Sequence, residues 1–194
     1  MSLRFNLLRL ALVPLSLLFL SPHTLHAQAS TTASKADDIS VFAGVEFANP
    51  EYGPDSNAGG AIGVDFTRYF RHIPVQPSLE LRANFNSGTY ADEHSYLFGV
   101  RAAYQYRRYN PYVDFLVGPG NVHYPLNVGY AGDNSIVYNY GGGLDIDLVR
   151  NFSLKLDLQQ QRWNTDTFQF TPVIGIVGVT YHIPFHSQVG YGRR

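Results

Sequence analysis

The sequence contains no cysteine and, beyond its amino-terminal segment, no apolar run long enough to cross a membrane as a helix. Without disulfides, stability has to come from backbone hydrogen bonds and packing. If the chain lies in a membrane it has to cross as a closed sheet, because lipid offers unpaired backbone groups no partner. Basic excess is also lacking. The formal net charge is −1, and removing Arg4 and Arg9, with no acid lost, makes it −3, which argues against a nucleic-acid partner.

The amino terminus is typical of a cleaved export signal. Arg4 and Arg9 precede a short apolar stretch from Leu10 to Leu20, which Pro14 interrupts. Small residues at Ala27 and Ala29 predict cleavage after residue 29. We therefore expect a signal peptide over residues 1–29 and a flexible leader over residues 30–37, followed by one domain.

In the rest of the chain, apolar residues recur at every second position. Leu154, Leu156 and Leu158, for example, alternate with polar residues. Successive side chains of a strand point to opposite faces, so each strand has one apolar and one polar face. In a soluble β-protein the apolar faces form the core, whereas in an outer-membrane barrel they face lipid and the polar faces line the interior.

The pattern predicts an all-β, eight-stranded antiparallel up-and-down transmembrane β-barrel over residues 38–185, with a periplasmic tail over 186–194. Long connections at 49–58, 87–93 and 125–134 alternate with short ones, as expected for outer loops and periplasmic turns; the short connection at 164–167 departs from the alternation. The predicted strands are 39–48, 59–70, 78–86, 95–106, 112–124, 136–148, 152–163 and 168–185.

The two faces differ in charge, which favours the membrane alternative. A charged residue at mid-bilayer costs ~2–4 kcal/mol, and unpaired charges buried in a soluble core would be severely destabilising. The predicted lipid face is uncharged: Val41, Val45, Ile62, Val64, Leu79, Leu81, Phe98, Val100, Val113, Phe115, Leu144, Ile146, Leu154, Leu156, Val177 and Val179. The opposite face holds Glu46, Asp65, Glu80, Arg82, Arg101, Asp114, Asp145, Asp147, Lys155 and Asp157.

Aromatic residues cluster near the predicted strand ends, where they favour membrane interfaces. One band lies near the short turns: Tyr69, Phe70, Tyr104, Tyr106, Tyr112, Phe152, Tyr181 and Phe185. The other lies near the long loops: Phe47, Phe85, Tyr96, Tyr138, Trp163, Phe168 and Phe170. Pro119 cannot donate to a ladder, so we expect a bulge around Gly118–Gly120.

The segment Ser95–Gly120, SYLFGVRAAYQYRRYNPYVDFLVGPG, resembles the small outer-membrane β-barrel domain family that includes opacity-type surface antigens and the membrane half of OmpA. The alternating residues that close on Phe185 are similar to the family's assembly signal, although nine further residues follow here. The resemblance implies localisation in a Gram-negative outer membrane. It also implies contact with outer-membrane lipid, lipopolysaccharide and the barrel assembly machinery.

Eight strands leave an interior just wide enough for side chains to fill. We therefore expect a lumen charge network of Glu80, Arg82, Arg101, Lys155 and Asp157 that plugs the barrel. A narrow, porin-like ion path through the same residues is the alternative.

Signals for chemistry are weak. His94 and Ser95 lie beside Asp92 and Glu93, but adjacent strand residues point to opposite faces, which is poor geometry for a catalytic pair. Gly141–Gly143 lies within a strand and precedes no helix, so it suits sheet curvature or a bulky lumen neighbour rather than phosphate. No histidine pair has metal-site spacing. We predict no catalytic, cofactor or metal site.

The sequence therefore predicts a non-enzymatic outer-membrane barrel with a structural or surface-interaction role. The long loops are the candidate contact regions for an extracellular ligand. Three alternatives remain: a narrow channel, a lipid-modifying hydrolase that uses Ser95, and a soluble exported lipocalin-like barrel with its apolar faces inside.

Overall fold

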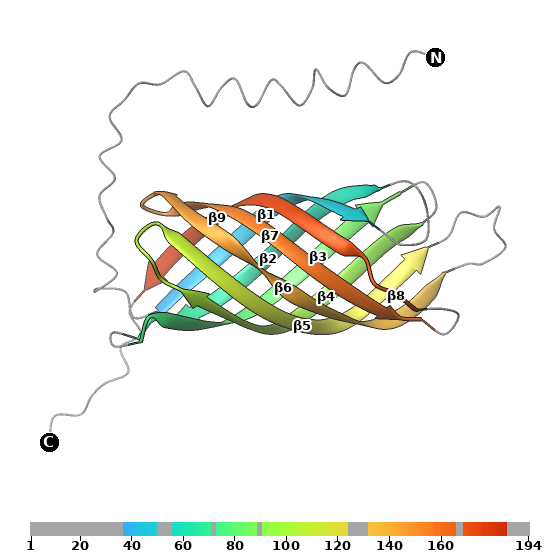
Figure 1. Ribbon diagram of the computed structural model, residues 1–194, viewed down its shortest axis with the longest axis horizontal. Coiled ribbons are helices and arrows are strands. Elements are labelled where there is room, and N and C mark those ends of the chain that lie inside the picture. Colours follow the sequence, from blue (N-terminus) through green and yellow to red (C-terminus); the bar gives the residue numbers. More distant parts are fainter. Residues whose placement is uncertain are drawn as a thin grey trace, which may run out of the picture.

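The computed structural model forms a closed antiparallel β-barrel (Figure 1). It describes residues 37–49, 56–70, 73–88, 91–123, 132–165 and 169–185. The predicted signal peptide, the leader up to residue 36 and the tail over 186–194 lie outside the described residues, as does most of the predicted long loops. No helix capable of crossing a membrane occurs in the described part of the chain.

Eight long strands form the wall, as the sequence predicted, with one short strand added at the rim. β1 pairs with β2 and with β9, and β6 pairs with β7, which closes the ring. The elements are β1 (Asp37–Asn49), β2 (Asn57–Arg68), β3 (Val75–Ser87), β4 (Asp92–Tyr104), β5 (Tyr109–His123), β6 (Asp133–Val149), β7 (Phe152–Asn164), β8 (Gln169–Phe170) and β9 (Val173–Phe185).

The last predicted strand is interrupted. The sequence indicated one strand over 168–185, whereas the structure has β8 and β9 on either side of Thr171 and Pro172. Proline has no N–H to donate to the ladder. Its carbonyl still accepts a hydrogen bond from the Gln161 N–H, at 3.0 Å, so this segment stays beside β7 despite the break.

The strand register sets the width of the barrel. Following paired residues once around the ring from Ile39 leads back to Asn49 of the same strand, ten residues further on. For eight strands this stagger corresponds to a tilt of about 40° from the barrel axis, and to an interior that side chains can fill. The strong slant of the strands is visible in Figure 1.

The side chains alternate as the sequence predicted. The apolar face points outward: Leu81 is 57% exposed, Val100 57% and Val113 64%. The opposite phase points into the lumen, where Glu46, Asp65 and Glu80 are fully buried. All ten predicted inward ionisable residues are buried, apart from Asp147, which is half-buried. The barrel is therefore apolar outside and ionic inside.

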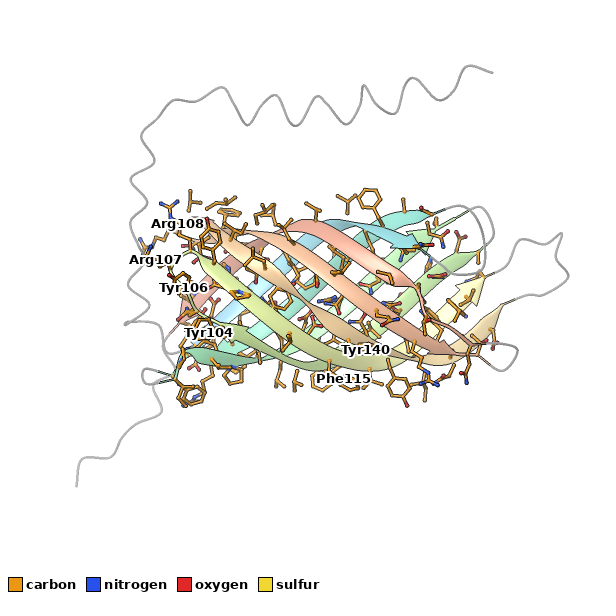
Figure 2. The ribbon with its side chains drawn as sticks, in the orientation of Figure 1. Tyr104, Tyr106, Arg107, Arg108, Phe115 and Tyr140 are labelled. Carbon is orange, nitrogen blue, oxygen red and sulfur yellow. The ribbon has the colours of Figure 1, made fainter. Side chains whose placement is uncertain are left out.

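The short turns gather at one end of the barrel, where the first strand begins and the last strand ends. Tyr106 and Tyr109 pair across a turn formed by Arg107 and Arg108. Asp37, at the start of β1, pairs with Phe185, at the end of β9. This end, on the left in Figures 1 and 2, is called the turn end below, and the opposite end is called the loop end.

Three aromatic residues assigned to the interface bands lie inside the barrel instead. Tyr112, Trp163 and Phe170 are only 4%, 1% and 4% exposed. Tyr112 shares the inward phase of Asp114, and Trp163 shares that of Gln161, so position near a strand end was a poorer guide than phase. Phe168 lies outside the described residues. Tyr104, Tyr106 and Tyr181 at the turn end, and Phe47, Tyr96 and Tyr138 towards the loop end, are exposed as predicted.

The bulge predicted around Gly118–Gly120 is also wrong. Pro119 pairs with Ile136 in the regular β5–β6 register. On its other side, the β4–β5 pairing stops after Ser95–Gly120 and resumes at Phe98–Val117 without a register change. The missing proline N–H is thus accommodated by a local gap in the ladder rather than by an extra residue.

Candidate functional site

The five residues of the predicted charge network all point into the lumen. Glu80 and Arg82 come from β3, Arg101 from β4, and Lys155 and Asp157 from β7. Each is less than 10% exposed. The structure brings three of them into direct contact, because Arg82 Nη2 lies 2.6 Å from Glu80 and 3.0 Å from Asp157. Arg101 and Lys155 belong to neighbouring groups.

Arg82 is the centre of the first group. Its guanidinium also contacts Asp114, at 3.1 Å. Gln159 Nε2 donates to the same Asp114 oxygen at 2.9 Å, and Gln159 Oε1 accepts a hydrogen bond from Asn139 Nδ2 at 2.9 Å. The cation therefore faces three buried carboxylates, and the Gln159 amide also donates to two of them, Asp114 and Asp157. Buried charges are stable only when they are paired and hydrogen-bonded in this manner.

Arg101 is the centre of a second group. Its Nη1 donates to Asp65 at 3.1 Å, and its Nη2 donates to Asp145. The guanidinium carbon lies 3.6 Å from the centre of the Tyr112 ring, a stacking contact typical of arginine. The sequence predicted that Asp65, Asp114 and Asp145 point inward, but it did not predict their contacts with the two arginines. Strand phase does not reveal which strands face each other across the lumen.

Lys155 joins the two groups through aromatic faces. Its Nζ lies 4.4 Å from the centre of the Tyr112 ring and 4.5 Å from the centre of the Phe42 ring. The residue is fully buried, and no carboxylate lies within 4.0 Å of Nζ among the described residues. A desolvated cation over ring faces gains ~2 kcal/mol or more from each favourable contact. Sequence analysis missed both aromatic partners.

Glycines on neighbouring strands leave space for these rings. Gly63 is the register partner of Phe42, and a Cβ at Gly63 would lie 2.3 Å from that ring. Gly143 is the register partner of Tyr112, and a Cβ there would lie 2.5 Å from the Tyr112 hydroxyl. The expectation that Gly143 leaves room for a bulky lumen neighbour agrees with this contact.

A second polar network lies at the turn end. Asp38 Oδ2 lies 2.7 Å from His182 Nδ1, and Ser153 Oγ lies 3.0 Å from His182 Nε2. Ser153 also contacts Asp147 Oδ1 at 2.8 Å. All three contacts are satisfied together when both ring nitrogens carry protons and Ser153 donates to Asp147. Burial raises the pKa of the Tyr69 phenol, as does the nearby Asp38 carboxylate.

In this network a serine, a histidine and an aspartate contact each other in the order found in a catalytic triad: Ser153 contacts His182, and His182 contacts Asp38. Sequence analysis missed it because the three residues come from β7, β9 and β1. The pair that it did consider is separated: Ser95 is buried in the lumen, whereas His94 packs on Phe85 with ring centres 5.5 Å apart. The expected mismatch in direction between His94 and Ser95 agrees with this arrangement.

Two apolar clusters lie in the lumen toward the loop end, among buried polar residues such as Glu46, Asn86 and Glu93. One buried cluster includes Trp163 and Phe170, whose rings stack with centres 5.5 Å apart, and a second cluster surrounds Phe42. Trp163 Nε1 donates to Gln161 at 3.0 Å, which satisfies its only polar group. The first cluster is completed by Ala91, Leu97, Leu116, Val122 and Val137. Arginine-centred ionic groups thus fill one part of the interior, and apolar clusters together with buried polar side chains fill the rest.

No protein-family model matches the sequence, and no curated protein is a significant match. Among solved structures, the barrel is similar to Neisserial surface protein A, with a TM-score of 0.54 and 14% identity over 77% of this chain and 97% of that one. It is also similar to Ail, the attachment invasion locus protein of Yersinia pestis, solved with the heparin analogue sucrose octasulfate. That TM-score is 0.51, with 12% identity over 76% of this chain and 97% of Ail.

The N-terminal β-barrel domain of Pseudomonas aeruginosa OprF is 20% identical over 74% of this chain and 97% of that one, with a TM-score of 0.49. The fold of this chain is that of the small eight-stranded outer-membrane barrels, as the sequence predicted.

Proposed function

We propose that this chain is a non-enzymatic outer-membrane barrel whose lumen is closed and whose loops make the functional contacts. One observation carries the proposal: residues exposed along the wall are apolar, whereas the ionic residues of the same strands are enclosed. In water, an uncovered apolar belt of this kind would drive association, whereas in a bilayer it matches the acyl chains. The same observation argues against a soluble lipocalin-like barrel.

Filling of the lumen supports a closed barrel rather than a channel. Two arginine-centred groups span its interior, and apolar side chains pack together beyond them. Ions would have to pass the salt bridges and then the closely packed side chains of the apolar clusters, which is a barrier to conduction. We expect planar bilayers containing the protein to show no steady conductance. A stable conductance that Arg101→Ala alters would instead favour the narrow channel.

The sign of the loop charge indicates what kind of contact the outer surface favours. Near the four loop-end connections, Glu51, Asp55, Asp92, Asp133 and Asp166 outnumber the one arginine, Arg162, whereas Glu93 is buried. An acidic surface repels polyanions and attracts cationic partners or divalent cations. We therefore propose contact with lipopolysaccharide through bridging divalent cations, or with a basic extracellular partner, rather than with a sulfated ligand such as that solved with Ail.

The direct test is extraction into detergent followed by electrophoresis with and without boiling. A closed barrel is expected to stay folded and to migrate differently until it is heated. Fractionation of cells is expected to recover the protein with the outer membrane. Recovery as a soluble periplasmic protein, or mobility that boiling does not change, would contradict the proposal.

A hydrolase is the second candidate, because Ser153, His182 and Asp38 lie in triad order. Two features favour a structural role. Ser153 is only 1% exposed, and its hydrogen bond to Asp147 directs its proton away from His182 and places a carboxylate 2.8 Å from the hydroxyl that would have to attack. We expect a fluorophosphonate probe to leave Ser153 unlabelled. Labelling that Ser153→Ala abolishes would establish the hydrolase instead.

A further inference from the structure

At the turn end of the barrel, acidic side chains point inward and basic side chains point outward. The carboxylates of Asp37 and Asp38 are buried, at 2% and 1% exposure, and Asp147 is half-buried against Ser153. Four arginines among the described residues of the same end are exposed. They form what we call the inner basic rim: Arg68 at the end of β2, Arg107 and Arg108 between β4 and β5, and Arg150 between β6 and β7. The outward surface of this end is therefore positive.

Ion pairs with the described residues do not neutralise the rim. Within the described ranges, no carboxylate oxygen lies within 4.0 Å of any of these four guanidinium groups. The guanidinium of Arg107 instead lies 5.7 Å from the centre of the Tyr106 ring. Figure 2 shows Tyr104, Tyr106, Arg107 and Arg108 together at this end of the barrel. Arginine and tyrosine at the membrane interface suit contact with phosphate headgroups.

Arg107 occupies a position that the backbone does not favour for arginine. Its φ is 58°, in the left-handed region that glycine and asparagine adopt more easily. The turn is held by hydrogen bonds of 3.0 and 2.9 Å between Tyr106 and Tyr109, and the Asp147 N–H donates to the Arg108 carbonyl at 2.8 Å. These bonds fix the turn, so Arg107 and Arg108 are held ready to bind. Strain at a defined position points to a use for the side chain.

An apolar groove on the outer wall begins at the same rim. It has a volume of about 240 Å³ and is lined by the apolar Phe66, Pro77, Leu79 and Val100 together with Arg68, Ser78 and Arg101. These apolar side chains belong to the outward face and are exposed. An apolar groove with the exposed Arg68 in its lining matches a phospholipid in both parts, acyl chain and phosphate.

We propose that the inner basic rim binds anionic phospholipids of the inner leaflet of the membrane. Phosphate groups contact Arg107 and Arg108 in the strained turn, and Arg68 holds a headgroup whose acyl chain follows the groove. Guanidinium groups suit this ligand because they form paired, charge-assisted hydrogen bonds with phosphate. The inference rests on the proposed membrane-spanning function. It adds a lipid class and a leaflet. The rim lies at the turn end, where β1 begins and β9 ends, and in outer-membrane barrels the short turns face the periplasm and therefore the inner leaflet.

The test is native mass spectrometry of the full-length mature protein, released from micelles that contain equal mole fractions of phosphatidylglycerol and phosphatidylcholine. We expect phosphatidylglycerol to be retained several-fold in preference to phosphatidylcholine, and high salt during loading to weaken the preference. The variant Arg107→Gln/Arg108→Gln is expected to lose most of it. Arg162→Gln is the matched control, because Arg162 is an exposed arginine at the loop end and should leave the preference unchanged.

Equal retention of the two lipids by the wild type, or undiminished preference in the double variant, would overturn the proposal. Electrophoresis with and without boiling is run on every variant. A double variant that keeps its heat-dependent mobility is folded, so its loss of lipid reports on the rim. A wild-type protein that never folds into bilayers contradicts the proposed function, whereas a folded wild type without lipid preference contradicts the rim alone.

Discussion

Lys155 Nζ lies 4.4 Å from the centre of the Tyr112 ring, and the Arg101 guanidinium lies 3.6 Å from the centre of the same ring. Tyr112 thereby connects two buried cations that come from different strands, β7 and β4. The carboxylates around these cations are also buried, so the charges compensate each other in a medium where water contributes little. Removing one cation should leave the buried carboxylates of the interior with too little compensating positive charge.

The variant Lys155→Met tests this coupling. It retains much of the side-chain volume but removes a positive charge from a lumen rich in carboxylates. We expect a loss of about 3–5 kcal/mol in the free energy of unfolding, the range for leaving buried charges uncompensated. The measurement is reversible urea unfolding in lipid vesicles. Arg162→Gln, on the exposed surface, should change stability by less than about 0.5 kcal/mol. A similarly small effect of Lys155→Met would contradict the inferred role.

The orientation of the wall can be tested with two arginine substitutions on one strand. Leu81 lies at the middle of β3 and Val75 at its start, and both point outward. Leu81→Arg should destabilise the barrel by ~2–4 kcal/mol, because the charge enters the middle of the bilayer, and Val75→Arg by only ~0–1 kcal/mol. Unfolding in vesicles gives both values. Equal effects at the two depths would indicate that the wall does not face lipid.

Topology is open to cysteine labelling, since the chain has no cysteine of its own. Asp92 lies at the loop end and Arg108 at the turn end, and both are exposed. A membrane-impermeant maleimide added to intact cells should label Asp92→Cys. It should reach Arg108→Cys only after the outer membrane is permeabilised. The reverse pattern would place the inner basic rim on the cell surface.

The network at the turn end should behave as a unit. Ser153 and His182 are hydrogen-bonded at 3.0 Å and connect Asp38 of β1 to Asp147 of β6. We expect Ser153→Ala and His182→Gln each to cost about 1 kcal/mol in unfolding free energy. The double variant should cost less than the sum by about 0.5 kcal/mol or more. The control is Ser40→Ala: Ser40 is paired with His182 in the β1–β9 register but takes no part in the hydrogen bonds of the network. Additive losses would show that the two residues act independently.

Much of the fold followed from local regularities. Alternation along Leu154–Leu158 and Val177–Val179 identified the strands, and the absence of charge from one phase identified the lipid face. These features are periodic, so neighbours in sequence determine them. The errors arose where a residue departs from the regular pattern, as at Pro172, where the last strand breaks, and at Trp163, whose phase outweighed its position near a strand end.

The candidate sites depended more on distant contacts. Sequence phase placed Arg82 and Asp157 inside the barrel, but their separation of 3.0 Å depends on how far each strand is staggered around the ring. The contact of Ser153 with His182 joins residues 29 positions apart, and that of His182 with Asp38 joins residues 144 positions apart. No local pattern encodes such separations.

The sequence alone determined that one side of every strand had to be buried away from lipid, because charge and apolar residues alternate along the chain. Closure of the ring decided which charges meet, since a buried ion is stabilised only by a partner close to it. Lys155 illustrates the division: its inward direction was evident from spacing, whereas its enclosure by Phe42 and Tyr112 arose only when three separate strands came together.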